Sequence, residues 1–90
     1  MKYRKNPVVI EAMQLKADNV SKVLEWINTF NGKAVSSGGY DNSDMPFLVI
    51  ETLEGQHLGL LNDFIIRGVK DEVYPCKPDI FEMTYEAVND

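Results

Sequence analysis

The chain has few of the side chains that most often carry chemistry. It contains one cysteine, Cys76, and one histidine, His57, among 90 residues. One cysteine can form neither an internal disulfide nor a thiolate metal cluster, and one histidine without nearby cysteines makes no recognisable zinc pattern. These counts favour a protein of a reducing cytoplasm, and we expect neither a metal ion nor a cofactor.

Long apolar runs are also missing. No stretch approaches the roughly 18 apolar residues that a membrane-spanning helix requires. The N-terminal sequence MKYRKNPVVIEAM has basic residues, but its apolar part is short, Glu11 interrupts it, and no small-residue cleavage site follows. We therefore expect a soluble protein without a signal peptide and without a membrane partner.

Positive charge is in the minority. The chain has 9 Lys and Arg against 14 Asp and Glu, which gives a formal net charge of -5. Proteins bind duplex DNA by neutralising its phosphates with Lys and Arg, so this balance argues against non-specific binding to duplex DNA. Lys2, Arg4 and Lys5 crowd the start of the chain and acidic residues crowd its end, so the two termini could attract each other.

The composition is that of a small globular domain. Hydrophobic residues make up 44% and charged residues 26% of the chain, both close to globular averages. The length suits one domain, spanning 1–90, that buries roughly 60–65% of its unfolded surface. Such a core leaves no room for a deep internal cavity, so we expect any binding site to be a surface groove or a subunit interface.

The first third of the chain predicts a strand followed by a helix. In NPVVIEAMQL, β-branched residues place Val8, Ile10 and Ala12 on one face of a strand. In ADNVSKVLEWINTFNG, the apolar residues change to the spacing of one helix face. Asp18 is the expected cap at the start of this helix, and Gly32 is its expected left-handed end.

Trp26 lies off the central apolar stripe of that helix. One interpretation places its large amphipathic ring at the rim of the core, because such rings are commonly buried in part. The other interpretation places the ring on an exposed interaction surface.

The stretch after the helix has little periodicity. A short strand is predicted at Lys33–Ser36, and residues 37–45, rich in Gly, Ser, Asn and Asp, are predicted to be a mobile loop. Within it, Asp41 to Asp44 could be read as a calcium-binding fragment. The central glycine and the closing glutamate of an EF-hand are missing, so a solvated loop is preferred.

From Pro46 onward the sequence predicts a meander of antiparallel strands. Reversals at Glu54–Gly55, Asn62–Asp63 and Lys70–Asp71 separate apolar runs, which implies four strands that are neighbours in chain order. The predicted fold class is α+β: a curved, mainly antiparallel sheet in the order β-α-β-β-β-β-β-α. The sheet could close like a barrel, with an amphipathic helix after the first strand and a second helix at the C-terminus.

The segment EVYPCKPDIFEMTYEAV predicts the corner between the last strand and the final helix. Pro75 cannot donate to a sheet ladder and is expected to end the strand, whereas Pro78 suits the first turn of a helix. Phe81, Tyr85 and Val88 share one face at helical spacing. We expect that face to dock on the sheet.

Cys76 lies between these prolines, near the start of the predicted helix. Such a position can lower the pKa of a thiol and make it nucleophilic, with His57 as the candidate base. The alternative is a small structural residue at a strand-to-helix corner. Nothing in the sequence places the thiol and the imidazole together, so the structural interpretation is preferred and no catalytic residue is assigned.

A candidate anion site involves Arg67, Tyr74 and Lys77. Lys77 lies at the start of the final helix, where free backbone N–H groups favour anions, and the other two residues lie nearby in the meander. Together they could hold a phosphate or a nucleotide base. The alternative is an ordinary solvated rim in which the Lys and Arg stems cover apolar surface.

Four segments carry a resemblance to a known family: YRKNPVVIEAMQL, DNVSKVLEWI, TLEGQH and DFIIRGVKDEVYPCKPDIFEMTYE. Together they resemble a family of small uncharacterised proteins encoded by phages and prophages of Gram-positive bacteria. The resemblance covers nearly the whole chain, and the block from Asp63 to Glu86 is its specific part. Relatives in that family commonly have glycine where this chain has Asn62 and Asp71, two residues that also suit turns. The resemblance implies the cytoplasm of a bacterial host and supplies no catalytic residues.

Two classes of function are compatible with these observations. The first is a phage accessory protein that binds a host or phage macromolecule without catalysis. The second is an oligomeric protein that sequesters a small molecule such as a nucleotide signal, motivated by the basic and aromatic residues at the strand-to-helix corner. An enzyme, the third and least favoured class, would need a Cys76–His57 pair or a site between subunits. A helix on one face of the sheet would leave the other face uncovered, which predicts a homodimer or another homo-oligomer.

Overall fold

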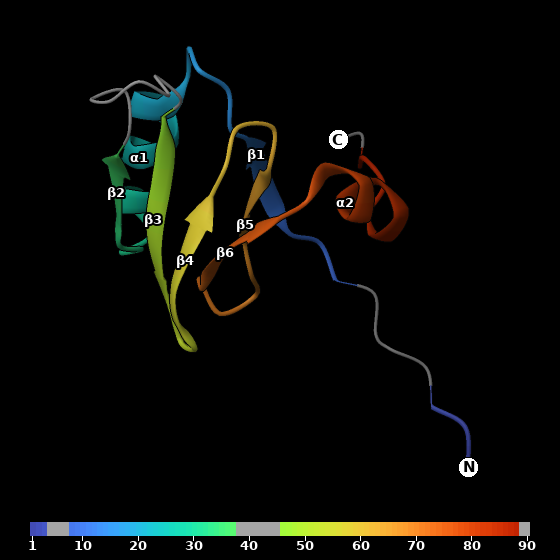
Figure 1. Ribbon diagram of the computed structural model, residues 1–90. Helices are drawn as coiled ribbons and strands as arrows, with labels where there is room; N and C mark the ends of the chain where they lie inside the picture. The colour runs from blue at the N-terminus through green and yellow to red at the C-terminus, as the bar shows by residue number, and fades with distance from the viewer. Residues whose placement is uncertain (4–7, 38–45, 89–90) are drawn as a thin grey trace.

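The computed structural model describes residues 1–3, 8–37 and 46–88 of the chain. Over these residues the fold is α+β, with two helices and six strands in two antiparallel sheets (Figure 1), which confirms the predicted fold class and order of elements. The elements are β1 (Glu11–Gln14), α1 (Val20–Thr29), β2 (Ala34–Ser37), β3 (Phe47–Thr52), β4 (Gly55–Gly59), β5 (Phe64–Arg67), β6 (Val73–Cys76) and α2 (Pro78–Thr84).

The strands are divided between two sheets of order β1-β5-β6 and β2-β3-β4. In the first sheet, Glu11 of β1 lies opposite Arg67 of β5, and Phe64 of β5 lies opposite Cys76 of β6. The prediction that all four strands of the meander are neighbours in chain order is wrong between β4 and β5, which lie in different sheets. The described strands therefore do not close into a barrel.

The position beside β5 is taken by β1 instead of β4. The turn before β5 is bonded to the end of β1, because the Leu15 N–H donates to the Asp63 carbonyl (2.8 Å) and the Asn62 N–H donates to the Leu15 carbonyl (2.7 Å). Gly59, at the end of β4, approaches β5 from the side of its face: a Cβ there would lie 3.0 Å from Cδ1 of Ile65. The pairing joins segments about fifty residues apart, which turn chemistry cannot specify.

Strand β1 is shorter than predicted. It begins at Glu11, and Val8–Ile10 precede it without pairing in a ladder. The reason is the length of its partner: β5 ends at Arg67, and the chain then turns at Gly68, whose N–H donates to the carbonyl of Glu72.

Helix α1 begins after Asn19, one residue later than the predicted cap at Asp18. The Asn19 side chain does not cap the helix, since it bridges the preceding loop instead. Its Oδ1 accepts a hydrogen bond from the Lys16 N–H (2.8 Å), and its Nδ2 donates to the Gln14 carbonyl (2.9 Å). The side chain thus joins the end of β1 to the start of α1.

At the other end of α1, Asn31 takes the left-handed conformation that was predicted for Gly32, with φ 65°. The Gly32 N–H donates to the Ile27 carbonyl at 3.0 Å, a Schellman-type ending. Glycine is needed at position 32 for space, because a Cβ would lie 2.6 Å from Cγ2 of Ile27 and 2.7 Å from Cγ2 of Val73.

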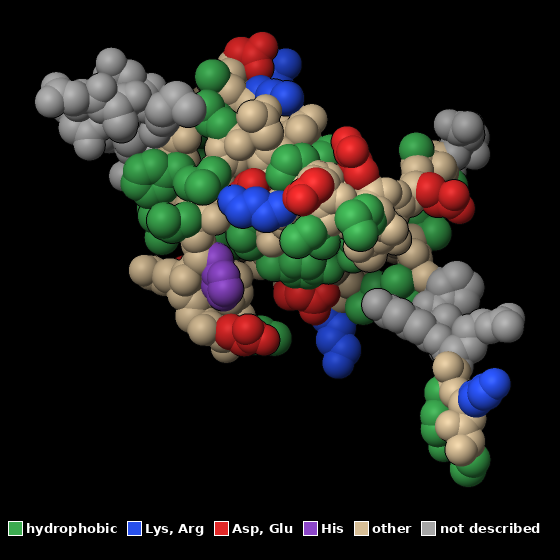
Figure 2. Space-filling view, turned by 45° about the vertical axis from the view of Figure 1, so that its right-hand side comes forward, with side chains coloured by type: hydrophobic (Ala, Val, Ile, Leu, Met, Phe, Trp, Pro, Cys, Tyr) green, Lys and Arg blue, Asp and Glu red, His purple; other side chains and the backbone are tan. Residues whose placement is uncertain are grey.

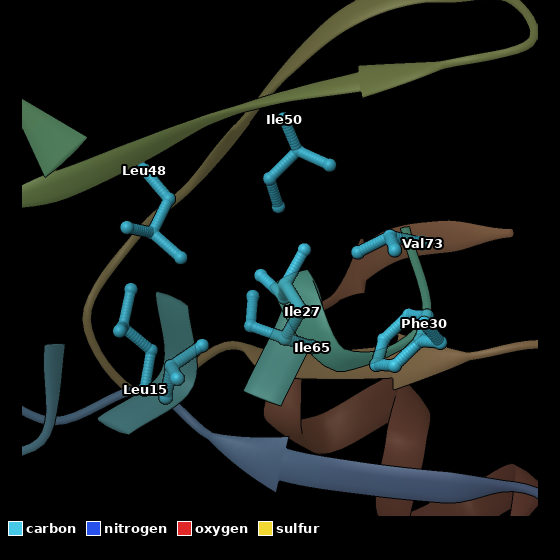
Figure 3. Close-up of a cluster of buried hydrophobic side chains, with 8 residues drawn as sticks. Leu15, Ile27, Phe30, Leu48, Ile50, Ile65 and Val73 are labelled. Carbon is cyan, nitrogen blue, oxygen red and sulfur yellow. The ribbon is translucent and has the colours of Figure 1, made fainter. Parts of the chain in front are cut away.

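One hydrophobic core joins α1 to both sheets. Figure 3 shows these side chains converging from α1, β3, β5, β6 and the loop before α1. The buried cluster consists of Leu15, Val23, Ile27, Phe30, Leu48, Ile50, Ile65 and Val73. Trp26 is half-buried and packs against this cluster at its rim, with its ring edge-on to Phe30 at 5.2 Å. The interaction surface considered for Trp26 stays a prediction.

The first sheet is covered on both faces. Ile65 and Ile66 are adjacent in β5 and both are fully buried, although consecutive strand residues point to opposite faces. Ile65 belongs to the core cluster. Ile66 lies on the other face with Phe64, whose ring stacks on Phe81 of α2.

The second sheet is covered on one face. Leu48 and Ile50 point into the core and are fully buried. On the opposite face, Val35 is 62% exposed and Leu58 is 55% exposed. Two apolar side chains therefore lie at the surface of a sheet whose other face contributes Leu48 and Ile50 to the core.

The reversals use the predicted turn residues. Gly55, Asn62 and Asp71 all have positive φ, at 108°, 77° and 62°. β2 spans Ala34–Ser37, one residue later than predicted. Of the predicted mobile loop at 37–45, Ser37 belongs to β2, and positions 38–45, including the possible calcium fragment, lie outside the described residues.

The corner before α2 is close to the prediction. Pro75 does not end the strand: it lies inside β6, which continues to Cys76. Among the described strands, β6 pairs with β5 alone. Proline is tolerated at position 75 because its backbone nitrogen, which has no hydrogen to donate, points away from β5. Pro78 is the first residue of α2, as predicted. The helix ends at Thr84, and Val88 beyond it is 61% exposed, so it does not share the docking of Phe81.

Candidate functional site

A groove of about 600 Å³ lies between the start of the first sheet and α2. One wall is the segment from Val8 to Ala12, and the other wall runs from Phe81 to Val88. Phe64 of β5 forms its floor. In Figure 1 the blue segment entering β1 passes beside the red helix α2, so the two walls come from opposite ends of the chain.

A stack of aromatic rings lines this groove. The rings of Phe64 and Phe81 are nearly parallel, at 5°, with centroids 3.9 Å apart. The ring of Tyr85 continues the stack at 4.9 Å from Phe81. Because these three side chains hold α2 against the sheet, the groove has a rigid apolar floor.

The groove runs along a free strand edge. Among the described strands, β1 pairs with β5 alone. The bond from the Leu15 N–H to Asp63 shows which backbone groups of β1 face β5, and the alternation of an antiparallel ladder turns those of Ala12 and Gln14 the other way. The Gln14 carbonyl accepts the Asn19 amide. Within the part of the chain that the structure describes, no backbone hydrogen bond reaches Ala12 from its outer side.

The rim of the groove is acidic. Glu82 and Glu86 line it and are exposed to solvent. Glu11, also in the lining, accepts a hydrogen bond at 2.8 Å from Nη1 of Arg67. The groove therefore combines an apolar floor, unpaired backbone groups and negative charge.

Arg67 and Lys77, two members of the predicted anion site, lie at opposite ends of the β5–β6 ladder. Arg67 is opposite Val73, the first residue of β6, whereas Lys77 follows the last. The structure therefore does not bring the two cations together.

Each of these cations is already engaged by carboxylates. The Arg67 guanidinium lies 2.8 Å from Asp71 and from Glu11 and 4.5 Å above the ring of Phe30. The hydrogen bond with Asp71, followed by weaker contributions from Glu11, raises the pKa of Arg67. Lys77 Nζ lies 3.2 Å from Asp63. Anion binding at these residues stays a prediction.

Tyr74, the third member, lies on the face of the first sheet that α2 covers, opposite Ile66. Burial is the main cause that raises the pKa of Tyr74 to about 12, and a hydrogen bond with Tyr85 adds to it. The phenol is therefore protonated at neutral pH and acts as a neutral polar group beneath α2.

Asp63 is a buried, ion-paired carboxylate, a feature that the sequence did not predict. The sequence indicated only that this residue belongs to a turn. It is the one buried charged residue of the described residues, and its side chain is 4% exposed. Oδ2 accepts a hydrogen bond from the Leu60 N–H at 3.0 Å, and Lys77 pairs with the carboxylate. These contacts fix the connection between β4 and β5, residues 60–63, which joins the two sheets. The role of Asp63 is therefore structural. Only the turn bond has a local signal, because Lys77 is distant in sequence.

Cys76 and His57 do not form a nucleophile–base pair in this structure. The Cys76 thiol is half-buried and donates to the Lys77 carbonyl at 3.6 Å. Burial raises the pKa of the thiol, and the negative charges of Asp63 and Asp79 add to the shift. This is the opposite of the activation that a helix start can provide.

His57 lies in β4, exposed at the surface, as Figure 2 shows. It lines a cavity of about 310 Å³ formed by Thr52–Glu54 and Glu72–Pro75. Cys76 is not part of that lining, and no hydrogen bond joins the two described side chains.

The described residues also bear on metals and membranes. Among them, no three His, Cys, Asp or Glu side chains are grouped so that they could hold a metal ion. Neither of the two described helices has the length and apolar character needed to cross a bilayer.

Comparison of the chain with protein-family models, with curated proteins and with solved structures found no match.

Proposed function

We propose that this chain is a small accessory protein of a phage or prophage that binds a host or phage macromolecule without catalysis, and that it does so as a homodimer in the host cytoplasm. The sequence resemblance supports the phage context. The observation that carries the homodimer is the outer face of the β2-β3-β4 sheet, whose apolar residues are Val35, Phe47, Val49 and Leu58.

This outer face has an unusual pattern for a sheet in contact with water. Val35 pairs with Val49, and Val49 pairs with Leu58, so one apolar row crosses all three strands. In an antiparallel sheet with one solvated face, residues along each strand normally alternate between apolar side chains on the buried face and polar side chains on the solvated face. Contiguous exposed apolar residues instead mark interaction sites.

The occupant that fits this face is a second copy of the chain. Lys33 and Glu51 flank the apolar row on the same face and line one shallow hollow with Val35 and Val49. A twofold axis parallel to the strands, lying just outside this face between β2 and β3, would set Val35 on Val49 of the partner subunit. The same axis sets Lys33 against Glu51 of the partner subunit, twice. A surface that complements itself in this way is what a twofold dimer requires.

Sedimentation velocity tests the homodimer. We expect the wild type to be a dimer, and Val49→Lys and Leu58→Lys to be folded monomers, because a charge in the apolar row would be buried without a partner. Met83→Lys is the matched control: it places the same charge on an apolar residue that is 86% exposed on α2, and it should remain dimeric.

Charge exchange gives a second test of the same interface. Lys33→Glu and Glu51→Lys should each weaken the dimer, whereas the double exchange should restore it, because both ion pairs across the axis are rebuilt with reversed sign. A wild type that stays monomeric at every concentration would refute the homodimer.

Binding to a macromolecule is tested by affinity recovery from infected cells. We expect a specific protein to be enriched with the wild type. A clean failure to enrich any phage or host component would count against the accessory role.

The alternative function, sequestration of a nucleotide signal, has weaker support. It relies on Arg67, Tyr74 and Lys77, and the two cations are already paired with carboxylates at separate places. Thermal shift against a panel of nucleotides distinguishes the two functions, because a tight ligand must raise the melting temperature.

A further inference from the structure

The segment before β1 has the composition of a strand but no strand partner among the residues that the structure describes. Val8, Val9 and Ile10 are β-branched, the residue type most favoured in strands. Val8 is 50% exposed and Val9 is 76% exposed, and the segment leads directly into the outer strand of the first sheet. An edge of this kind is a template on which another strand can pair.

The backbone of this edge presents groups in the right direction for pairing. The alternation of the ladder turns the N–H and C=O of Ala12 away from β5. Strand β1, Glu11–Gln14, is about 13 Å long, at about 3.3 Å per residue, and Val8–Ile10 lead into it. That length accommodates a short extended peptide.

The groove beside this edge supplies pockets for side chains. Alternate side chains of an added strand would point toward α2, where the rings of Phe64, Phe81 and Tyr85 form the floor. Residues at the groove rim would meet the exposed carboxylates of Glu82 and Glu86. The lining therefore selects apolar side chains in alternation, together with Lys or Arg.

We propose that this groove binds an extended segment of a partner protein, which adds as a strand to the free edge of β1. The segment has alternating apolar side chains and at least one Lys or Arg. This proposal rests on the macromolecular binding proposed above and names the chemistry of the partner. The groove lies on the first sheet and the homodimer face on the second, so the two surfaces are separate.

The binding test uses a defined probe: a fluorescein-labelled synthetic peptide of about seven residues that alternates Val with Thr and carries Lys near both ends. Fluorescence anisotropy should show saturable binding. Two control peptides share its length. Replacing the Lys residues by Glu should weaken binding at least about tenfold, and N-methylation of alternate amides should abolish it, because the peptide then loses the donors that pair with β1.

Two proline variants separate the free edge from the ladder. Ala12→Pro removes the outward N–H and leaves the bonds to β5 in place, so it should unfold like the wild type but no longer bind the peptide. Met13→Pro removes an N–H that points to β5, opposite Ile65, and should instead lower the stability of the fold.

Charge variants test the acidic rim. The double variant Glu82→Lys, Glu86→Lys should weaken the peptide at least about tenfold. Glu25→Lys is the matched control, since it reverses an exposed carboxylate on α1, away from the groove, and should bind like the wild type.

Three results would overturn the proposal. The first is no saturable binding of the Val-Thr-Lys peptide, and the second is binding that Ala12→Pro leaves unchanged. The third is loss of the dimer in Ala12→Pro without peptide binding, which would make this edge a contact between two copies. A wild-type monomer that still binds the peptide in this pattern would reject the homodimer and support the strand-addition site.

Discussion

The two sheets of this molecule have three described strands each but different surroundings. In the β1-β5-β6 sheet, Ile65 and Ile66 are adjacent and both fully buried, because α1 and the second sheet cover one face while α2 covers the other. In the β2-β3-β4 sheet, Leu48 and Ile50 are buried, but Val35 and Leu58 on the opposite face are more than half exposed. The first sheet is thus covered on both faces, whereas the second is covered on one face and exposed on the other.

This difference separates residues that stabilise the fold from residues available for contact. Burial of an apolar side chain stabilises the folded state in proportion to the area removed from water. The row Val35–Val49–Leu58, in which Val35 and Leu58 are more than half exposed, contributes less of this stabilisation to the single chain, so its apolar character is better explained by an interface.

Truncation in the first sheet should have the largest effect. Ile66→Ala removes a fully buried side chain and should lower the free energy of unfolding by about 2–5 kcal/mol. Val35→Ala, in the second sheet, should change it by less than about 0.5 kcal/mol at low protein concentration. Urea unfolding followed by circular dichroism measures both. Equal losses of unfolding free energy in the two variants would contradict this difference between the two sheets.

The two glycines at the sheet ends should differ in size of effect and in cause. Gly32→Ala inserts a Cβ between Ile27 and Val73 and should destabilise the protein by about 1–3 kcal/mol through overpacking. At Gly55, in the β3–β4 hairpin, no atom lies within 4 Å of an added Cβ, but φ is 108°. Gly55→Ala should therefore lower stability by about 1 kcal/mol through backbone strain alone. Ile27→Leu removes the Cγ2 that the added Cβ would meet. If this change relieves Gly32→Ala but not Gly55→Ala, the packing cause is established.

Asp63 lies in the connection between β4 and β5, which joins the two sheets. Asp63→Ala removes the acceptor of the Leu60 N–H and should lower the free energy of unfolding by about 1–2 kcal/mol. The exposed Asp18→Ala is a matched control and should have little effect, since the Asp18 side chain has no capping role in the structure. Thermal unfolding of both variants provides the comparison, and a neutral Asp63→Ala would remove the role assigned to this carboxylate.

Tyr74 should produce a small effect that depends on pH. Its pKa is raised to about 12 in the folded protein from the ordinary value of 10.0, so above about pH 10 the unfolded chain loses the phenolic proton first. The stabilisation is complete below that pH and is lost as the pH rises toward about 12. Tyr74→Phe should show a shallower decline across this window in pH-dependent unfolding. Parallel profiles would show that the phenol is not buried beneath α2.

Much of the local structure could be predicted from the sequence. The helical spacing of Val20, Val23 and Ile27 identified α1, Pro78 identified the start of α2, and the Glu54–Gly55 reversal identified the β3–β4 hairpin. Each of these signals lies within a few residues, so each can be read without knowing what the segment packs against. The same is true of Asn62 and Asp71, whose positive φ values fit their predicted turns.

The site was less accessible to prediction. Its floor brings Phe64 to Phe81 and its walls bring Val8 to Tyr85, pairs that are far apart in the chain. The predicted anion residues failed to converge for a related reason: Arg67 and Lys77 are close in sequence terms within the meander, but the register places them at opposite ends of the ladder. Closeness in the sequence therefore did not predict closeness in space, because the register of the β5–β6 pair decides which residues lie opposite one another.

Amino-acid order alone determined which segments are helices, which are strands and where the chain turns, because periodicity, proline geometry and left-handed turn residues act over a few residues. Tertiary structure decided that β1 rather than β4 lies beside β5, and it thereby decided which faces are buried and which edge is free. Strand pairing depends on contacts between distant segments that compete for the same edge, and their relative free energies are settled only when the whole core packs.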